Sequence, residues 1–190
     1  MECVIALREW AVAVKALEAG RQIIVLRKGG IAEETKEFRL ESPAFYLFPS
    51  FEHQRPHLVK PEAGDMVGLT EAEASAFAGR ARITSYAEVA DDIEVTDAET
   101  LRRLDALHIW TEDYAEERLK WKKTKPLHVL VLRVYTLEEP KEIPMLESYG
   151  GCKSWLTIED AGGRSDFMKP VINDSDFKKM AAAVKQAIAG

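Results

Sequence analysis

The amino-acid sequence predicts an α+β fold in which a mixed, strongly curved sheet, or a barrel, is flanked by helices. Segments with helical apolar spacing and segments with short β-branched runs are interspersed along the 190 residues. The clearest strand is LHVLVLRVYTL, which begins at Leu127, and its mixed apolar run indicates partial burial on both faces. A chain of this length can bury roughly 70% of its unfolded surface, so we expect a single domain over residues 1–190, with any subdivision near 61–79.

Prolines and glycines divide the first half of the chain. The expected segments are a helix over 5–19, a buried strand over 21–28, an extended piece over 38–48, a short helical turn over 51–55 and a polar loop over 61–68. Gly20 stands where a left-handed helix cap belongs. Pro43 breaks the extended piece, while Ser50 and Pro56 bound the helical turn.

Helix caps organise the second half. Thr70 and Glu73 have capping-box spacing, and Thr96 and Glu99 repeat it before the next helix. Thr111 is expected to cap a third helix. The remaining segments are strands over 81–95, 127–137 and 154–158, and a last helix over about 175–188, capped by Ser175, whose apolar face carries Phe177, Met180, Ala181, Val184 and Ile188.

Composition narrows the function classes. The net charge is −6, so any binding of nucleic acid would need a local basic patch. Cys3 and Cys152 form no CxxC pair, fit a reducing compartment, and are interpreted as buried or inert. We find no signal-peptide pattern and no apolar stretch near the roughly 20 residues needed to cross a bilayer. The expected location is therefore the cytoplasm, with no membrane partner.

The first candidate site is LRKGG, where Arg27 and Lys28 lead from a strand into Gly29 and Gly30. A backbone of this kind can approach a ligand closely and expose its amides. The alternative is an ordinary β-turn with solvated charges, since the spacing matches neither a P-loop nor a dinucleotide fingerprint.

The second candidate site is SFEHQRPH, which packs Glu52, His53, Gln54 and Arg55 into one turn. Gln54 and Arg55 could offer bidentate contacts to a base edge or a phosphate. Structural capping is the alternative. The two histidines of this motif are four residues apart, but the proline between them breaks the helix that a zinc site would need, so we expect no metal.

The third candidate site is RLKWKKTK, where basic residues surround Trp121. Lys122 and Lys123 make this the local basic patch, and an indole among cations can stack nucleic-acid bases at about 1–3 kcal/mol per base. Lysines on a solvated helix surface are the alternative. Trp155 lies at an element boundary, where it could form a pocket wall or a core edge.

The sequence carries no strong catalytic signature. Glu34-Thr35-Lys36 supplies the E-x-K tripeptide of restriction-type nucleases, but the upstream Pro-Asp partner is missing, and only Glu9 or Glu18 could serve as the second carboxylate. No triad and no G-x-S-x-G motif can be assembled. The sequence thus favours a non-catalytic protein without a cofactor, and a nuclease using Glu34 and Lys36 is the enzymatic alternative.

Several motifs together resemble an uncharacterised bacterial family of domains of unknown function, DUF1802. They are EWAVAVKAL, LRKGGI, FYLFPSFEHQ, RLKWK, PLHVLVLRVYTLEEP and GGCKSWLTI, and they run from about Leu7 to beyond Ile158. The resemblance implies no established activity. Because family members are sometimes found beside restriction-type nuclease domains, it suggests a nuclease partner and a role in defence against foreign DNA.

The second half is also similar, more distantly, to PUA-like barrels of the ASCH and EVE kinds. It has a strand ARITSYAEV, a helical insertion, and then VLRVYTLEEPKEIP. Glu37-Phe38-Arg39 resembles the E-x-R of ASCH domains, although the glycine and lysine that should precede it are displaced to Gly30 and Lys28. This likeness implies binding of RNA or of modified bases in a cleft between barrel and helix.

The leading hypothesis is therefore a module that binds DNA or RNA. The basic patch around Trp121 would track phosphates, and the turn from Glu52 to Arg55 would read a base, which could be a modified one. A third hypothesis is a non-catalytic subunit whose C-terminal amphipathic helix docks on a nuclease or on a second copy of the chain.

Overall fold

The computed structural model describes residues 3–28, 38–52, 54–121, 123–159 and 168–190. Its strands form one mixed sheet of seven, in the order β2-β5-β4-β3-β1-β6, with β7 paired to β5. The strand bounds are β1 Cys3–Trp10, β2 Ile24–Arg27, β3 Ala44–Ser50, β4 Arg80–Val95, β5 Leu127–Pro144, β6 Trp155–Glu159 and β7 Met168–Pro170. The helix bounds are α1 Ala11–Glu18, α2 Gly64–Ala76, α3 Ala98–Arg103, α4 Glu112–Lys120 and α5 Asp174–Ala189, with 3₁₀ turns at Pro56–Leu58, Pro61–Ala63, Asp105–Leu107 and Glu147–Tyr149.

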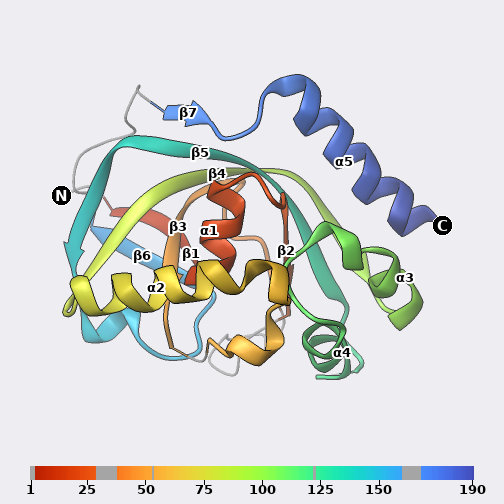
Figure 1. The fold of residues 1–190 in the computed structure, drawn as a ribbon, viewed down its shortest axis with the longest axis horizontal. Coiled ribbons are helices and arrows are strands. Elements are labelled where there is room, and N and C mark those ends of the chain that lie inside the picture. Colours follow the sequence, from red (N-terminus) through yellow and green to blue (C-terminus); the bar gives the residue numbers. More distant parts are fainter. Residues whose placement is uncertain (1–2, 29–37, 53, 122, 160–167) are drawn as a thin grey trace.

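The sheet curves around α1 (Figure 1). β4 and β5 form a long antiparallel pair whose register shifts twice, at Ile83/Ser85 and at Val89/Asp91. Such irregularities bend and twist paired strands. β1 and β3 are parallel, whereas the other pairings are antiparallel. The expected mixed, curved sheet with flanking helices is therefore confirmed, and the sheet remains open rather than closing into a barrel.

The start of the chain corrects the predicted helix over 5–19. Residues 3–10 form the strand β1, which lies between β3 and β6, and only the following eight residues are helical. The apolar residues of this stretch also suit a strand that is buried between two neighbours. Trp10 consequently stands at the N-cap of α1 and not within a helix. This change matters for function because it places Arg8 and Glu9 at the end of a strand.

Two other predictions were wrong in the region before β4. The polar loop expected over 61–68 is a 3₁₀ turn at Pro61–Ala63 followed by the beginning of α2. Thr70 therefore lies inside this helix, where its hydroxyl donates to the carbonyl of Val67 at 2.7 Å. The helical turn expected over 51–55 forms instead over Pro56–Leu58. Proline suits the first position of a helical turn because its missing N–H would have no partner there.

Most later elements agree with the predictions. Thr111 caps α4 by accepting a hydrogen bond from Tyr114 N at 3.4 Å. The caps of α3 and α5 are Asp97 and Asn173, each one or two residues from the position expected. The strands over 81–95, 127–137 and 154–158 are present as β4, β5 and β6.

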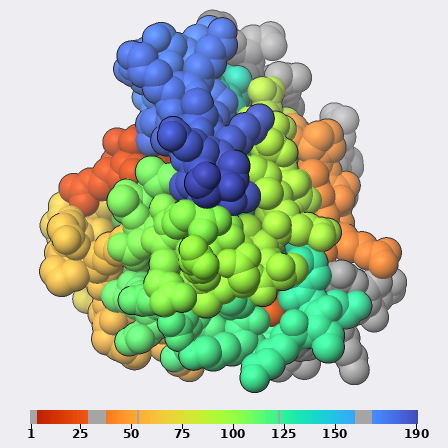
Figure 2. Space-filling model, turned by 90° about the vertical axis from the view of Figure 1, so that its right-hand side faces the viewer, coloured from red at the N-terminus to blue at the C-terminus, as the bar shows by residue number. Residues whose placement is uncertain are grey.

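The C-terminal helix packs on its own chain. α5 lies against α3 and β4 on the face seen in Figure 2. Val184 is buried, and the other predicted apolar residues of this face pack against the main core. Arg103 also donates to the carbonyl oxygens of Ala187 and Ile188 at the end of the helix, at 2.6 and 3.1 Å. The apolar face expected to bind a partner is thus covered within the chain.

No helix in the part of the chain described by the structure is long and apolar enough to span a membrane.

Candidate anion-binding pocket

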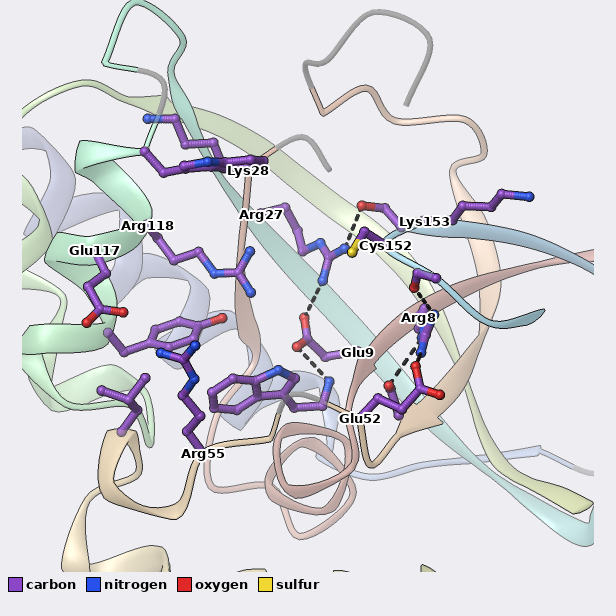
Figure 3. Close-up of a pocket in the computed structure, with 17 residues that line it drawn as sticks. Arg8, Glu9, Arg27, Lys28, Glu52, Arg55, Glu117, Arg118, Cys152 and Lys153 are labelled. Atoms are coloured by element: carbon purple, nitrogen blue, oxygen red, sulfur yellow. Dashed lines mark hydrogen bonds and ion pairs between the residues drawn. The ribbon is translucent and has the colours of Figure 1, made fainter. Parts of the chain in front are cut away.

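A pocket of about 420 Å³ opens where β1 and β2 end beside α4 (Figure 3). Its lining comes from five segments of the chain. They contribute Arg8, Glu9 and Trp10; Arg27 and Lys28; Ser50, Glu52, Arg55 and Leu58; Tyr114, Glu117, Arg118 and Trp121; and Gly151, Cys152, Lys153 and Ser154.

Arg8 forms one side of the pocket through three contacts. It donates from Nε to Ser50 Oγ at 3.1 Å and from Nη2 to Glu52 Oε2 at 2.6 Å. Its Nη1 donates to the carbonyl oxygen of Gly151. Gly151 has a φ of +88°, a conformation that glycine adopts without a Cβ penalty. The Arg8 guanidinium is therefore held on three sides by the protein.

Arg27 and Glu9 form a buried ion pair in the floor of the pocket. Arg27 Nη1 lies 3.0 Å from Glu9 Oε2, and the Glu9 side chain is only 1% exposed. Arg27 Nη2 donates to Ser154 Oγ at 2.7 Å. The other carboxylate oxygen of Glu9 accepts from the backbone N–H of Trp10 at 2.8 Å. Both oxygens of Glu9 are thus occupied, and this charge pair ties β1, β2 and the segment before β6 together.

Arg55 and Arg118 form the opposite, helical side and differ from the first two arginines. In Figure 3 their guanidinium groups point toward the pocket. Neither makes an ion pair within the described ranges of the chain. Arg118 lies over the ring of Tyr114, with 5.2 Å between its Cζ and the ring centroid. Two cations are therefore presented to the pocket without a direct ion pair among the described residues, although the nearby carboxylates of Glu9 and Glu117 attract Arg118 electrostatically.

Tyr114 anchors an aromatic cluster under Arg118. Its ring stacks on Trp110, with centroids 5.0 Å apart and an interplanar angle of 8°, and meets the edge of Trp10 at 5.0 Å. Burial raises the pKa of Tyr114, although the positive charge of Arg118 opposes the shift, so the phenol is protonated at neutral pH. Despite the nearby guanidinium, its buried hydroxyl has no partner at hydrogen-bonding geometry among the described residues. A buried donor without a partner is costly unless something else satisfies it.

Lys28 connects the pocket to the end of α4. Its Nζ donates to the carbonyl oxygen of Leu119 at 2.6 Å, where the last carbonyl groups of the helix lack partners within the helix. Burial lowers the pKa of Lys28. Lys28 thereby fixes the position of the helical side relative to β2, just before Trp121.

The lining carries an excess of positive charge. Six of its side chains are basic and three are acidic, namely Glu9, Glu52 and Glu117. Glu9 and Glu52 neutralise the two arginines of the sheet side. The excess is therefore concentrated on the helical side and at Lys153, in a protein whose net charge is −6. Such a concave basic surface attracts anions.

Five of the residues predicted from the sequence meet in this pocket. They are Arg27, Lys28, Glu52, Arg55 and Trp121. They come from all three motifs that the sequence singled out, which are far apart along the chain. The structure therefore brings the three motifs to one place, a convergence that spacing alone does not reveal.

Three further predicted residues lie elsewhere. Gln54 accepts a hydrogen bond from Val12 N at 2.9 Å and donates to Thr70 Oγ1 at 3.0 Å, so it joins the start of α1 to α2. Trp155 donates to the carbonyl oxygen of Arg39 and belongs to the core. Lys123 is exposed and does not line the pocket.

The other predicted site residues lie outside the described residues. They are Gly29, Gly30, Glu34, Lys36, His53 and Lys122.

Sequence reasoning missed Arg8 and Tyr114 as members of a site, and it considered Glu9 only for the metal of a nuclease. Arg8 and Glu9 are a pair of charged residues inside an otherwise apolar stretch, and helical spacing places such a pair on a solvated face. Tyr114 gives no signal apart from its position near the basic motif. Cys152, interpreted as buried or inert, is exposed at the pocket because it follows Gly151 in the loop before β6.

No three potential metal ligands among histidine, cysteine, aspartate and glutamate gather anywhere in the described ranges.

The pocket belongs to a protein of a recognised family. A family model described as "Domain of unknown function (DUF1802)" matches residues 6–183, so the chain belongs to that family, as its motifs indicated. A comparison with curated proteins gives no match.

Solved structures of low similarity were also found. The ASCH protein of Zymomonas mobilis is 12% identical and aligns over 82% of this chain and 87% of its own, with a TM-score of 0.47. A serine-to-alanine variant of that protein is 11% identical over 94% of both chains, with a TM-score of 0.44. We transfer no residue role from these structures.

Proposed function

We propose that this protein binds single-stranded nucleic acid and takes one nucleotide into the pocket beside α4. The observation that carries the proposal is the pair Arg55 and Arg118, two guanidinium groups that face the pocket without an ion-pair partner among the described residues. A guanidinium is well suited to phosphate because its N–H groups match two oxygens at once.

The aromatic residues of the lining support the same ligand class. Trp10 and Trp121 line the pocket beside the cations, whereas the Tyr114 ring is stacked on Trp110 and lies under Arg118. Binding of single-stranded nucleic acid commonly combines a basic groove with aromatic rings on which bases stack. The pocket volume of about 420 Å³ is within the usual range for small-ligand sites. A pocket of this size suits one nucleotide and not a duplex.

A preference for unpaired bases follows from this size. A base within a duplex would first have to leave its stack, which costs a few kcal/mol, whereas a base in a single strand is already accessible. Discrimination of a modified base, within a restriction or defence system, is the finer part of the proposal. Its support is the position of Glu52 and Arg55 at the pocket, where each could contact a base edge.

The experiment is a titration of tryptophan fluorescence with short single- and double-stranded DNA and RNA, modified and unmodified, at two salt concentrations. Trp10 and Trp121 line the pocket, so occupancy should change the emission. We expect salt-dependent binding of single strands that Arg118→Gln weakens at least tenfold. Arg102→Gln removes an exposed arginine of α3 outside the pocket and serves as the matched control. Equal binding by both variants, or no binding by the wild type, would refute the proposal.

A metal-dependent nuclease remains the alternative that the sequence raised, but no observation on the described residues favours it. Glu9, one of the two carboxylates considered for its metal site, is committed to Arg27 and to the N–H of Trp10.

A further inference from the structure

We infer that the pocket receives the terminal phosphate of a strand, a phosphomonoester, ahead of the base. The inference deepens the proposed function and rests on it. It assigns to the site a ligand class, the phosphorylated end of a nucleic acid, and a direction of entry.

The inner part of the pocket is formed by deeply buried residues. Glu9, Trp10, Arg27, Tyr114 and Ser154 all line it, yet each is at most 9% exposed. Hydrogen bonds link four of these residues in a chain, from Trp10 to Glu9, Arg27 and Ser154. These buried residues form a floor beneath the opening, so a nucleotide that reaches them enters either base first, from within a strand, or phosphate first, from an end.

Two buried groups near this floor can donate a hydrogen bond to a ligand. The Tyr114 hydroxyl and Arg27 Nε have no partner at hydrogen-bonding geometry among the described residues, although the Arg118 guanidinium lies close to that hydroxyl. Arg118 adds a guanidinium without an ion pair, and a guanidinium can only donate. Each carboxylate oxygen of Glu9 already receives one hydrogen bond from within the protein.

This donor surplus distinguishes a phosphate from a base. Most base edges present donors and acceptors together, so a base would leave its own donors facing donors in this floor. A phosphate presents oxygen acceptors alone and can satisfy several of the unpartnered groups at once. The cost of burying those groups in the free protein would be recovered when the phosphate binds.

Charge favours the end of a strand over its interior. An internal phosphodiester carries a single negative charge, whereas a phosphomonoester carries about −1.5 to −2 at neutral pH. Four cations of the lining form no ion pair within the described part of the chain, namely Arg55, Arg118, Lys28 and Lys153. Among the acidic residues of the lining, only Glu117 also lacks an ion pair there. The more highly charged group is therefore the better match for this pocket.

With the phosphate inside, the terminal base lies nearer the mouth of the pocket, where the half-buried Trp121 offers a stacking surface.

The experiment compares unlabelled ten-nucleotide single strands of one sequence that differ only at their ends. One has a 5′-phosphate, one a 3′-phosphate and one two hydroxyl ends, and each is titrated against tryptophan fluorescence. Inorganic phosphate and a nucleoside monophosphate are tested as competitors. We expect one phosphorylated strand to bind at least tenfold more tightly than the hydroxyl-ended strand, and the preferred end identifies the source of the phosphate.

Variants assign this preference to the pocket. Arg118→Gln should abolish the preference, Arg118→Lys should retain part of it because the charge remains, and Arg102→Gln should leave it unchanged. Circular dichroism establishes that each variant is folded. Equal affinity for all three strands would overturn the inference while the proposed function stands, and so would a preference that survives in Arg118→Gln. If the nucleoside monophosphate binds and none of the three strands does, the proposed function is overturned, and the inference that the pocket receives a phosphate is supported. No binding by any ligand would overturn both.

Discussion

Arg8 and Arg27 on the sheet side of the pocket resemble Arg55 and Arg118 on the helical side in chemistry but differ in their partners. The first two hold carboxylates, at 2.6 Å from Glu52 and 3.0 Å from Glu9, whereas the other two have none among the described residues. Arg8 and Arg27 are buried, where a charge without a partner is costly, whereas Arg55 is exposed and Arg118 is half-buried, so water can solvate them in the free protein. Arg8 and Arg27 therefore stabilise the fold, whereas Arg55 and Arg118 remain available to bind an anion.

The largest effect should come from the sheet side. Arg27→Met removes the partner of Glu9, whose side chain is 1% exposed, and leaves a buried carboxylate uncompensated. We expect the free energy of unfolding to fall by about 3 kcal/mol, the usual cost of breaking a buried ion pair from one side. Urea denaturation followed by circular dichroism measures it.

A double variant provides the control for this prediction. Glu9→Gln combined with Arg27→Met removes both charges and keeps an acceptor for the N–H of Trp10. It should recover at least half of the lost stability. If the single variant is as stable as the wild type, the pair has no role in the fold and the contrast between the two sides disappears.

The helical side should show the opposite behaviour, with stability preserved and binding lost. Arg55→Gln with Arg118→Gln breaks no ion pair in the described part of the protein, so the unfolding free energy should change by less than about 1 kcal/mol. Each phosphate contact contributes about 0.7 to the slope of log K against log salt for a single strand. We therefore expect this slope to become shallower by about 1.4, as measured by titrations from 50 to 200 mM salt. An unchanged slope would mean that neither arginine contacts a phosphate.

A single hydroxyl tests the same contrast more finely. Tyr114→Phe removes a buried donor that has no hydrogen-bond partner among the described residues, so thermal unfolding should show no loss of stability. If the hydroxyl donates to the ligand, affinity for the phosphorylated strand should fall about fivefold, the equivalent of one neutral hydrogen bond. Affinity for the hydroxyl-ended strand provides the internal control and should change less. A clear loss of stability would show that the hydroxyl already has a role in the free protein.

The same contrast explains how much of the site the sequence could predict. Arg27, Lys28, Glu52, Arg55 and Trp121 were recognisable because each lies in a short motif rich in charge or aromatic residues. The pairing of Glu9 with Arg27 was not, because it depends on residues 3–10 forming a strand between β3 and β6. Apolar spacing in that stretch is compatible with a helix, and only the neighbouring strands decide between the two.

Elsewhere the local sequence patterns predicted β5 correctly and placed the start of α2 wrongly, and both outcomes have a physical reason. The β-branched run after Leu127 formed β5 as expected, since its burial leaves few alternatives. The N-cap of α2 is Ala63, which provides no side-chain cap, so the capping pattern at Thr70 pointed to a start that lies seven residues too late. The fold class was accessible from the sequence because it depends on many elements, whereas the site depends on how a few side chains meet.

The smallest effect should come from the basic patch beyond the pocket. Lys123 is exposed, makes no ion pair within the described ranges, and does not line the pocket. Lys123→Ala should therefore act only through screened attraction, weakening all strands about twofold at 50 mM salt without changing the preference for a phosphorylated end. At 1 M salt, where the screening length is about 3 Å, the difference from the wild type should vanish. Titrations of the same three strands at both salt concentrations measure this. A tenfold loss, or an altered end preference, would place Lys123 in direct contact with the ligand and extend the binding surface from the pocket along the segment after α4.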